Sequence, residues 1–248
     1  MPSESAGPSC QGRGVRIGVV DSGVATGHPH VGGVAGGVAI RADGRVDVDA
    51  MDRIGHGTAV AAAIREKVPE AELYAVKVFD RALSSDVAIL VRGIEWAVEA
   101  GCQLINLSLG TRQAQHEPRL QQVVTWAAEH GSVIVAAGAA DDSRWLPGSL
   151  PGVLEVRADW DCPRNTFRVE RSATGGVICR ASGYPREIPG IPPERNLKGV
   201  SFAVANMTGF AARVVEPRRG VSLDDLARRL ASSADVTVPG LLGFSATC

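Results

Sequence analysis

The chain has 248 residues, of which 45% are hydrophobic and 21% are charged, and its formal net charge at pH 7 is −1. This length suits one large α/β domain with a sizeable core. The near-zero charge gives no electrostatic reason to expect a nucleic acid or an anionic membrane as a partner. The sequence has no run of about eighteen apolar residues, so it predicts no helix that spans a bilayer.

The N-terminal residues Met1–Gly14 are polar and rich in glycine, serine and proline, without the apolar run of a signal peptide. We expect them to form a flexible tail before a single domain over residues 15–248. The cysteines are odd in number and lack metal-ligand spacing: Cys10, Cys102, Cys162, Cys179 and Cys248. We therefore expect reduced thiols, no disulfide framework or zinc site, and a cytoplasmic location.

Short apolar runs rich in β-branched residues predict six strands. They are Val15–Val20, Leu73–Phe79, Gln103–Leu107, Ser132–Ala137, Val153–Arg157 and Gly176–Arg180. The runs are apolar nearly throughout and do not alternate with polar residues. This pattern is typical of strands that are buried on both faces of a parallel sheet.

Helical patterns lie between and after these runs. We expect helices directly after His56, over Ser85–Ala100, over Pro118–His130, after Ser201 and over Leu223–Ala231. The second and third are each followed by a glycine, which suits the residue after a helix end. The alternation predicts a doubly wound, mostly parallel sheet with helices on both faces, in which ligands bind at the carboxyl ends of the strands.

Three short motifs each place one residue of an Asp/His/Ser set among small residues. They are Val19–Gly23 (Val-Val-Asp-Ser-Gly), Gly55–Thr58 (Gly-His-Gly-Thr) and Gly199–Ala203 (Gly-Val-Ser-Phe-Ala). A serine hydroxyl becomes a good nucleophile when an imidazole removes its proton, and a buried carboxylate holds that imidazole in the correct tautomer. Asp21, His56 and Ser201 supply these three groups.

The placement of these residues favours catalysis. Asp21 follows directly after the first predicted strand, at the edge of the sheet where functional residues gather. Ser201 begins a largely apolar helix, whose free backbone N–H groups and positive dipole end would stabilise a developing oxyanion. His56, between two glycines at the start of its own helix, can point into the same cleft.

In this chain order the three motifs resemble the signature blocks of the subtilisin-like serine peptidase family, the subtilases. The resemblance covers nearly all of the chain from Val15 to about Glu216 and implies the subtilisin-like α/β fold. It also implies a serine endopeptidase that works through an acyl-enzyme. Ser201 would attack, His56 would act as general base and then acid, and Asp21 would orient His56. The Ser201 backbone N–H would bind the oxyanion.

The resemblance extends to substrate binding. Ser108, Leu109 and Gly110 look like the strand with which family members pair the backbone of an extended peptide. Ala136, Ala137 and Gly138 resemble the wall of the primary specificity pocket. A second strand against the substrate would lie near Ala82–Ser85. The segment Leu146–Gly148 is similar to a turn that carries a cis proline in the family.

The sequence departs from the family at Ala139, where related enzymes have an asparagine that donates its amide to the oxyanion. For a member of this family, loss of this donor costs about 100- to 1000-fold in turnover. Asn196, Ser143 and Arg144 are candidates for a substitute donor, and the sequence does not rank them. Val200 also replaces a usual threonine, and Ala205–Asn206 replaces a common Pro-His pair.

Two functions remain open. The first is an active but slow or specialised endopeptidase, with the removal of a leader segment from a biosynthetic precursor peptide as one such role. The alternative is a pseudoprotease that binds extended peptides without cutting them. In either case we expect a peptide or protein partner, with no cofactor and no metal. The carboxylates of one acidic segment are interpreted as a solvated loop: Asp43, Asp47, Asp49 and Asp52. The oligomeric state is not predicted.

Overall fold

The computed structural model describes residues 10–80, 82, 85–139, 143–171, 176–192, 195–216, 222–232, 234–238 and 241–244. The strands are β1 (Arg16–Asp21), β2 (Gly36–Ile40), β3 (Val46–Asp47), β4 (Glu72–Lys77), β5 (Leu104–Leu107), β6 (Val133–Ala137), β7 (Val153–Asp159), β8 (Phe167–Arg171), β9 (Val177–Ser182), β10 (Ala234–Val238) and β11 (Leu241–Phe244). The helices are α1 (His56–Lys67), α2 (Val87–Glu99), the short 3₁₀ helix η1 (Ala114–His116), α3 (Glu117–Glu129), α4 (Val200–Val215) and α5 (Leu223–Ser232).

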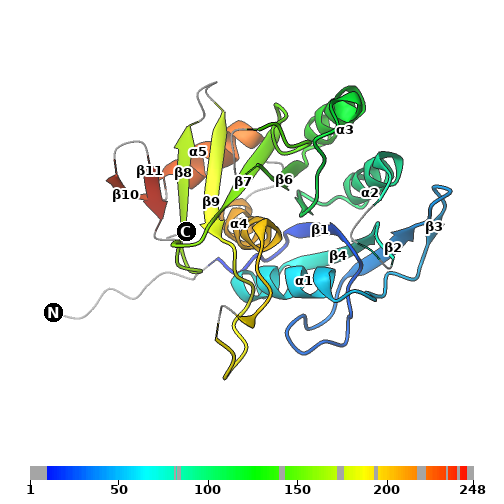
Figure 1. The fold of residues 1–248 in the computed structure, drawn as a ribbon, viewed down its shortest axis with the longest axis horizontal. Coiled ribbons are helices and arrows are strands. Elements are labelled where there is room, and N and C mark those ends of the chain that lie inside the picture. Colours follow the sequence, from blue (N-terminus) through cyan, green and yellow to red (C-terminus); the bar gives the residue numbers. More distant parts are fainter. Residues whose placement is uncertain are drawn as a thin grey trace.

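Among these residues eleven strands form one sheet, in the order β10-β11-β8-β9-β7-β6-β5-β1-β4-β2-β3 (Figure 1). The central pairs from β2 to β9 are parallel, whereas the pairs at both ends of the sheet are antiparallel. The strand order reverses around β1, which lies between β5 and β4. Open α/β sheets bind ligands outside the carboxyl ends of such strands.

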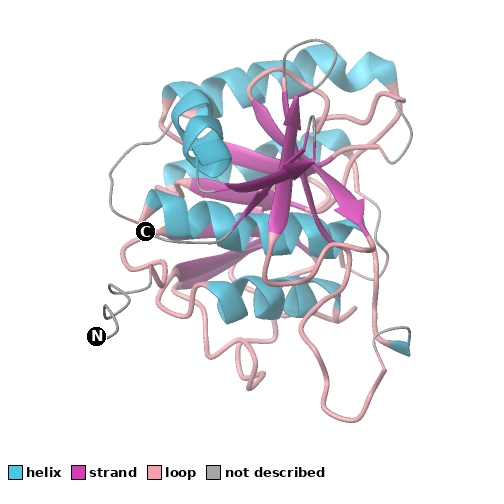
Figure 2. Ribbon diagram, turned by 90° about the vertical axis from the view of Figure 1, so that its left-hand side faces the viewer, coloured by secondary structure: helices cyan, strands magenta, loops and turns pink. Residues whose placement is uncertain are grey.

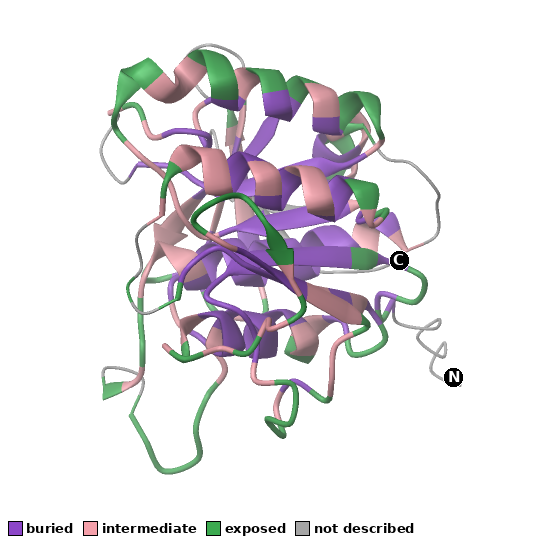
Figure 3. Ribbon diagram, turned by 90° about the vertical axis from the view of Figure 1, so that its right-hand side faces the viewer, coloured by how far each residue is buried: buried purple, intermediate pink, exposed green. Residues whose placement is uncertain are grey.

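Helices cover both faces of the sheet (Figure 2). Helices α1, α4 and α5 contact one another or neighbouring strands on one face, and α2 and α3 cover the other. Each layer encloses its own cluster of buried apolar side chains. The strands are therefore buried between helices whose outer sides are exposed (Figure 3), as expected for a doubly wound sheet.

Helix α4 lies at the centre of its layer. It contacts α1, α5 and four strands of the sheet, and 12 of its 16 residues are buried. A helix that is apolar on all sides belongs in a core. Its first turn carries Ser201, so that residue is attached to one of the most deeply embedded elements of the fold.

The predicted fold class is confirmed, and each predicted strand and helix is present within a few residues of its expected bounds. Gly101 and Gly131 follow the ends of α2 and α3 with φ of 74° and 77°, in the left-handed region that glycine tolerates. The Leu146–Pro147 peptide bond is cis, as the resemblance implied.

The sequence did not predict β2, β3, β8, β10 or β11. Strand β2 opens with two glycines, which weaken any strand pattern. Strand β8 alternates apolar and charged residues because it belongs to the antiparallel part of the sheet. Strands β10 and β11 follow α5, the last predicted helix.

The N-terminal segment differs from the expected tail where the structure describes it. Gly12 N donates to the carboxylate of Glu216 at 2.6 Å, and Gln11 O accepts from Glu70 N at 2.9 Å, so this part lies against the domain. Residues 1–9 lie outside the described residues. The expectation of reduced thiols is wrong at Cys10, which is disulfide-bonded. Three other cysteines are free and buried: Cys102, Cys162 and Cys179.

Candidate active site

Asp21 and His56 are in direct contact at the carboxyl end of β1. The His56 Nδ1 atom lies 2.7 Å from Asp21 Oδ1, and the same oxygen accepts from the backbone N–H of Ser22 at 2.7 Å. The Asp21 side chain is only 1% exposed and the His56 side chain 17% exposed. This contact engages Nδ1, so Nε2 is the ring nitrogen that remains to face a nucleophile.

Gly57 makes the close approach of these two residues possible. A Cβ atom at position 57 would collide with the carbonyl oxygen of Gly23 and would lie 3.2 Å from the Asp21 side chain. Any larger residue there would push the start of α1 away from the end of β1. Steric crowding therefore explains why the second glycine of the Gly-His-Gly-Thr motif is a glycine.

Two opposing effects act on the His56 pKa. Burial lowers the pKa, while the hydrogen bond to Asp21 and the negative charges of Asp21 and Asp52 raise it. The charge effects prevail, and the pKa is raised above its ordinary value of 6.5. The protonated ring is therefore stabilised, which is what a general base requires after it accepts a proton.

The first turn of α1 is held by two side chains that lie outside the helix. Ser22 Oγ accepts from the Gly57 N–H at 2.9 Å and donates to Asp52 Oδ1 at 2.9 Å. Asp52 Oδ2 accepts from both the backbone N–H and the hydroxyl of Thr58, at 2.9 and 2.6 Å. Because these N–H groups have no partner within a helix, the bonds fix the position of His56 at the helix start.

Asp52 is a functional candidate that the sequence reading missed. Its Oδ1 atom also accepts from the N–H groups of Ile54 and Gly55, at 2.9 and 2.8 Å. Burial raises its pKa, but these hydrogen bonds outweigh the burial and the net pKa is lowered. The interpretation of Asp52 as a solvated loop residue is thus wrong. Its position four residues before the histidine was the only available signal.

Ser201 and Ser108 are joined by two hydrogen bonds. The Ser201 hydroxyl donates to the backbone oxygen of Ser108 at 3.3 Å, and the Ser108 hydroxyl donates to the backbone oxygen of Ser201 at 3.3 Å. The ring of Phe202 lies 5.9 Å from that of His56, which places the start of α4 beside the imidazole. Among the described residues, no hydrogen bond joins the Ser201 hydroxyl to His56.

A buried polar chain ties α4 to the end of β5. Thr208 donates to Asn106 Oδ1 at 3.0 Å, and Asn106 Nδ2 donates to the Ser108 hydroxyl at 3.0 Å. Asn206, in the position where the family often has histidine, donates to the backbone oxygens of Ser182 and Tyr184 at 2.9 and 3.0 Å. Thr208, Asn106 and Ser108 thus connect the middle of α4 to the segment that accepts the Ser201 hydroxyl.

The proposed substrate-binding residues differ in accessibility. Ser108, Leu109 and Gly110 are half-buried, so this segment is partly exposed at the end of β5. Ala136, Ala137 and Gly138 are buried within the sheet and its cores. The segment expected near Ala82–Ser85 includes residues 83 and 84, which lie outside the described residues.

Ala139 stands at the position where the resemblance places an oxyanion donor. Ala139 is only 4% exposed and offers no side-chain donor. Asn196 donates to the backbone oxygen of Arg186 at 3.1 Å, and Arg144 forms two hydrogen bonds of 2.5 Å with Glu117. The backbone N–H of Ser201, in the first turn of α4, has no acceptor among the described residues and can donate to an oxyanion.

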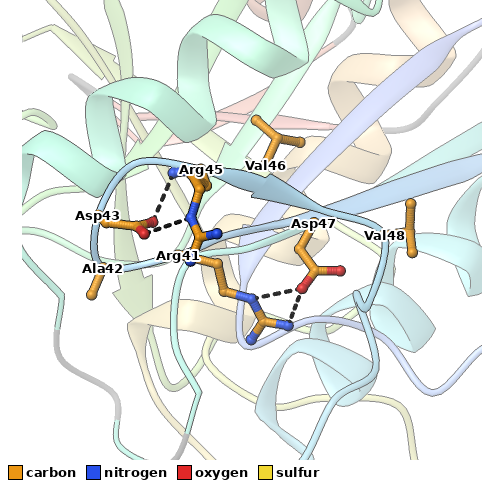
Figure 4. Close-up of a pocket in the computed structure, with 7 residues that line it drawn as sticks. All are labelled: Arg41, Ala42, Asp43, Arg45, Val46, Asp47 and Val48. Carbon is orange, nitrogen blue, oxygen red and sulfur yellow. Dashed lines mark hydrogen bonds and ion pairs between the residues drawn. The ribbon is translucent and has the colours of Figure 1, made fainter.

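A surface pocket lies on the β2–β3 hairpin (Figure 4). It is lined by Arg41, Ala42, Asp43, Arg45, Val46, Asp47 and Val48. Its two arginines pair within the hairpin, Arg41 with Asp47 at 2.5 Å and Arg45 with Asp43 at 2.6 Å. These pairs neutralise two of the four carboxylates of the acidic segment, those of Asp43 and Asp47. The described residues contain no cluster of three or more metal-ligating side chains.

A mostly parallel α/β sheet with an Asp–His pair at one strand end and a serine on the central helix defines the architecture of a subtilisin-like hydrolase. The chain belongs to the subtilase family, whose family model matches residues 12–244. In the parts of the chain that the structure describes, no helix combines the length and apolarity needed to cross a membrane.

Several named proteins resemble the chain. It is 32% identical over 220 residues to a thermostable alkaline protease of Halalkalibacterium halodurans, covering 82% of this chain and 57% of the relative. It is 29% identical over 243 residues to subtilisin DY of Bacillus licheniformis, covering 90% and 85%. A cold-adapted subtilisin-like serine proteinase shares the fold, with a TM-score of 0.71, 22% identity and coverage of 93% and 85%. The chain thus spans little more than half of the first relative.

Proposed function

We propose that this protein is a serine endopeptidase that cleaves peptide bonds through an acyl-enzyme. The observation that carries the proposal is the 2.7 Å contact between His56 and Asp21, with the raised pKa of His56 and with Ser201 on the adjacent helix end. The relatives named as proteases support the same activity.

In the proposed reaction the Ser201 Oγ bonds to the substrate carbonyl carbon while its proton passes to His56 Nε2. The carbonyl oxygen becomes an oxyanion that accepts a hydrogen bond from the Ser201 N–H. His56 then gives the proton to the amine as the C–N bond breaks. Water, activated by His56, cleaves the ester that remains. The substrate would lie extended along Ser108–Gly110 as an added strand.

A pseudoprotease that binds peptides without cutting is the second candidate. Two observations favour it: the Ser201 hydroxyl donates to Ser108 rather than to His56, and Ala139 offers no donor. A rotation about the Cα–Cβ bond of Ser201 is what the enzyme function requires. Serine side chains make such rotamer changes rapidly when they are accessible.

We further propose a dedicated substrate, such as a precursor peptide that loses its leader, rather than general proteolysis. The weak oxyanion region supports this role, because a slow enzyme suits a single bond that is presented to it. The cytoplasmic location stays a prediction. The free cysteines favour it, while the disulfide at Cys10 is a bond that persists in oxidising compartments.

Labelling with a fluorophosphonate, which reacts with activated serines, tests the proposal. We expect one label per chain in the wild type and none in Ser201→Ala. Ser232→Ala, which removes an exposed hydroxyl at the end of α5, is the matched control and should label normally. Absence of labelling, with peptides still bound, would establish the pseudoprotease instead.

A further inference from the structure

The chain segments that follow β5 and β6 leave the sheet side by side. The two strands are parallel neighbours, with Leu107 opposite Ala136. The segment after β5 carries Ser108, whose backbone oxygen bonds to the Ser201 hydroxyl. A space between these segments is therefore the natural place for the side chain of a peptide residue whose carbonyl lies at Ser201.

A tight turn over residues 145–149 occupies this space. Thr111 N donates to Leu146 O at 2.8 Å, and Leu146 N donates to Thr111 O at 2.9 Å. On its other side the turn touches the segment after β6, because a Cβ atom at Gly148 would lie 2.7 Å from the Ala137 carbonyl carbon and 3.1 Å from Gly138 N. The turn thus bridges both segments.

The Trp145 side chain projects from this turn against Gly110. A Cβ atom at Gly110 would collide with the indole nitrogen and would lie 2.6 Å from Leu146 O. The indole packs against the same core cluster as α4, and the guanidinium of Arg112 covers its ring at 5.7 Å. Only a glycine at position 110 leaves space for the indole, and the indole fills that space.

The indole N–H is buried and has no acceptor among the described residues. Buried indole N–H groups usually find a partner, because leaving one unpaired costs free energy. The indole nitrogen lies against Gly110 with almost no accessible surface, so the tight packing of this side chain leaves its donor unpaired.

We propose that Trp145 limits the residue preceding the cleaved bond to a small side chain, with glycine, alanine and serine accepted. This inference rests on the proposed endopeptidase function. In that function the residue that carries the attacked carbonyl lies nearest to Ser108 and Gly110. A leucine or phenylalanine side chain at that place would have to displace the indole from its contacts with the core.

The test uses probes of the form acetyl-Ala-Ala-X diphenyl phosphonate, in which X is glycine, alanine, leucine or phenylalanine and the phosphorus reacts with an active serine. For the wild type we expect the alanine probe to label at least about 100-fold faster than the phenylalanine probe. In Trp145→Ala the difference should fall below about tenfold. Trp145→Leu, which keeps part of the apolar volume, should be intermediate.

Trp96→Ala is the matched control, since Trp96 lies on α2 and contacts Tyr74 on the other face of the sheet, with ring centres 6.3 Å apart. It should keep the wild-type preference. Each variant is first checked for a cooperative thermal transition. Equal labelling of the wild type by alanine and phenylalanine probes would overturn the role of Trp145 while leaving the endopeptidase function intact.

If no probe labels the wild type, the proposed endopeptidase function is wrong. The preference for a small side chain is then tested by peptide binding alone. Calorimetric titration of Ser201→Ala with acetyl-Ala-Ala-Ala-Ala and acetyl-Ala-Ala-Phe-Ala measures it. Tighter binding of the alanine peptide, lost in the double variant with Trp145→Ala, supports the inference. Equal or tighter binding of the phenylalanine peptide contradicts it.

Discussion

The two halves of the candidate site differ in how densely they are hydrogen-bonded. On the base side, Asp21, Ser22 and Asp52 accept or donate in a connected network around His56. On the nucleophile side, Ala139 and Val200 replace polar residues of the family, and the Ser201 hydroxyl donates to a backbone oxygen. The base is therefore oriented in advance, while the proposed stabilisation of an oxyanion depends on backbone N–H groups.

This contrast indicates that a site can keep the residues that orient its base while it lacks side chains that stabilise an oxyanion. An imidazole needs a fixed orientation and a nearby negative charge, and both come from buried side chains that also hold the fold. An oxyanion donor serves only the transition state, so its loss costs rate without costing stability. The variants predicted below either weaken the hydrogen bonds around His56 or add a donor near Ser201.

The largest effect is expected for Asp21→Asn. The amide keeps the shape of the side chain but favours the wrong tautomer of His56, so kcat should fall by about 10⁴-fold. Single-turnover kinetics with a peptide that the wild type cleaves measure the change in rate. The melting temperature shows whether the variant is folded. A loss of less than about tenfold in a folded variant would remove the Asp–His pair from the mechanism.

Ala139→Asn should restore the missing donor and raise kcat by up to about 100-fold, with little change in KM. Ala139→Leu is the control, because leucine has nearly the shape of asparagine but cannot donate. An asparagine variant with the wild-type melting temperature and unchanged kcat would indicate that another group already fills the oxyanion position.

Asp52→Ala should lower both stability and rate, because it leaves the N–H groups at the start of α1 without acceptors. Loss of hydrogen bonds to a carboxylate of this kind costs about 2–4 kcal/mol of the free energy of unfolding. Asp49→Ala removes a neighbouring carboxylate that pairs with exposed Arg53, and it should cost less than about 1 kcal/mol. Denaturant unfolding of the two variants compares them directly, and equal losses would argue against the network.

The smallest effect is a shift in the pH profile. His56 must be neutral to accept a proton, so kcat/KM should fall as the pH drops through its pKa, which lies above 6.5. Asp52→Asn removes one of the negative charges that raise this pKa, so the acid limb should move to lower pH. Asp49→Asn should leave the limb in place. A shift to higher pH would contradict the assigned role of Asp52.

Much of the fold was predictable because buried parallel strands leave continuous apolar runs. The strands without such runs, among them β2 with its glycines and β8 with its charges, were missed. The Asp21, His56 and Ser201 motifs could be read from sequence because each lies at a predictable end of an element. Their catalytic roles stay predictions.

The contacts of Asp52 and Trp145 could not be predicted from the sequence. Asp52 belongs to a sequence segment with three other aspartates, and the sequence around it does not distinguish a carboxylate that accepts five hydrogen bonds from one paired with a surface arginine. The contact of Trp145 with Gly110 joins residues 35 positions apart through a turn whose path depends on tertiary structure.

Because α4 is buried on nearly all sides, we expect its backbone amides to be among the slowest to exchange with solvent, and Ser201 is anchored to this helix. Local openings at the sheet edges would leave its position undisturbed. Heat inactivation should then coincide with the cooperative melting of the whole domain. The catalytic centre would have no separate, more fragile transition of its own.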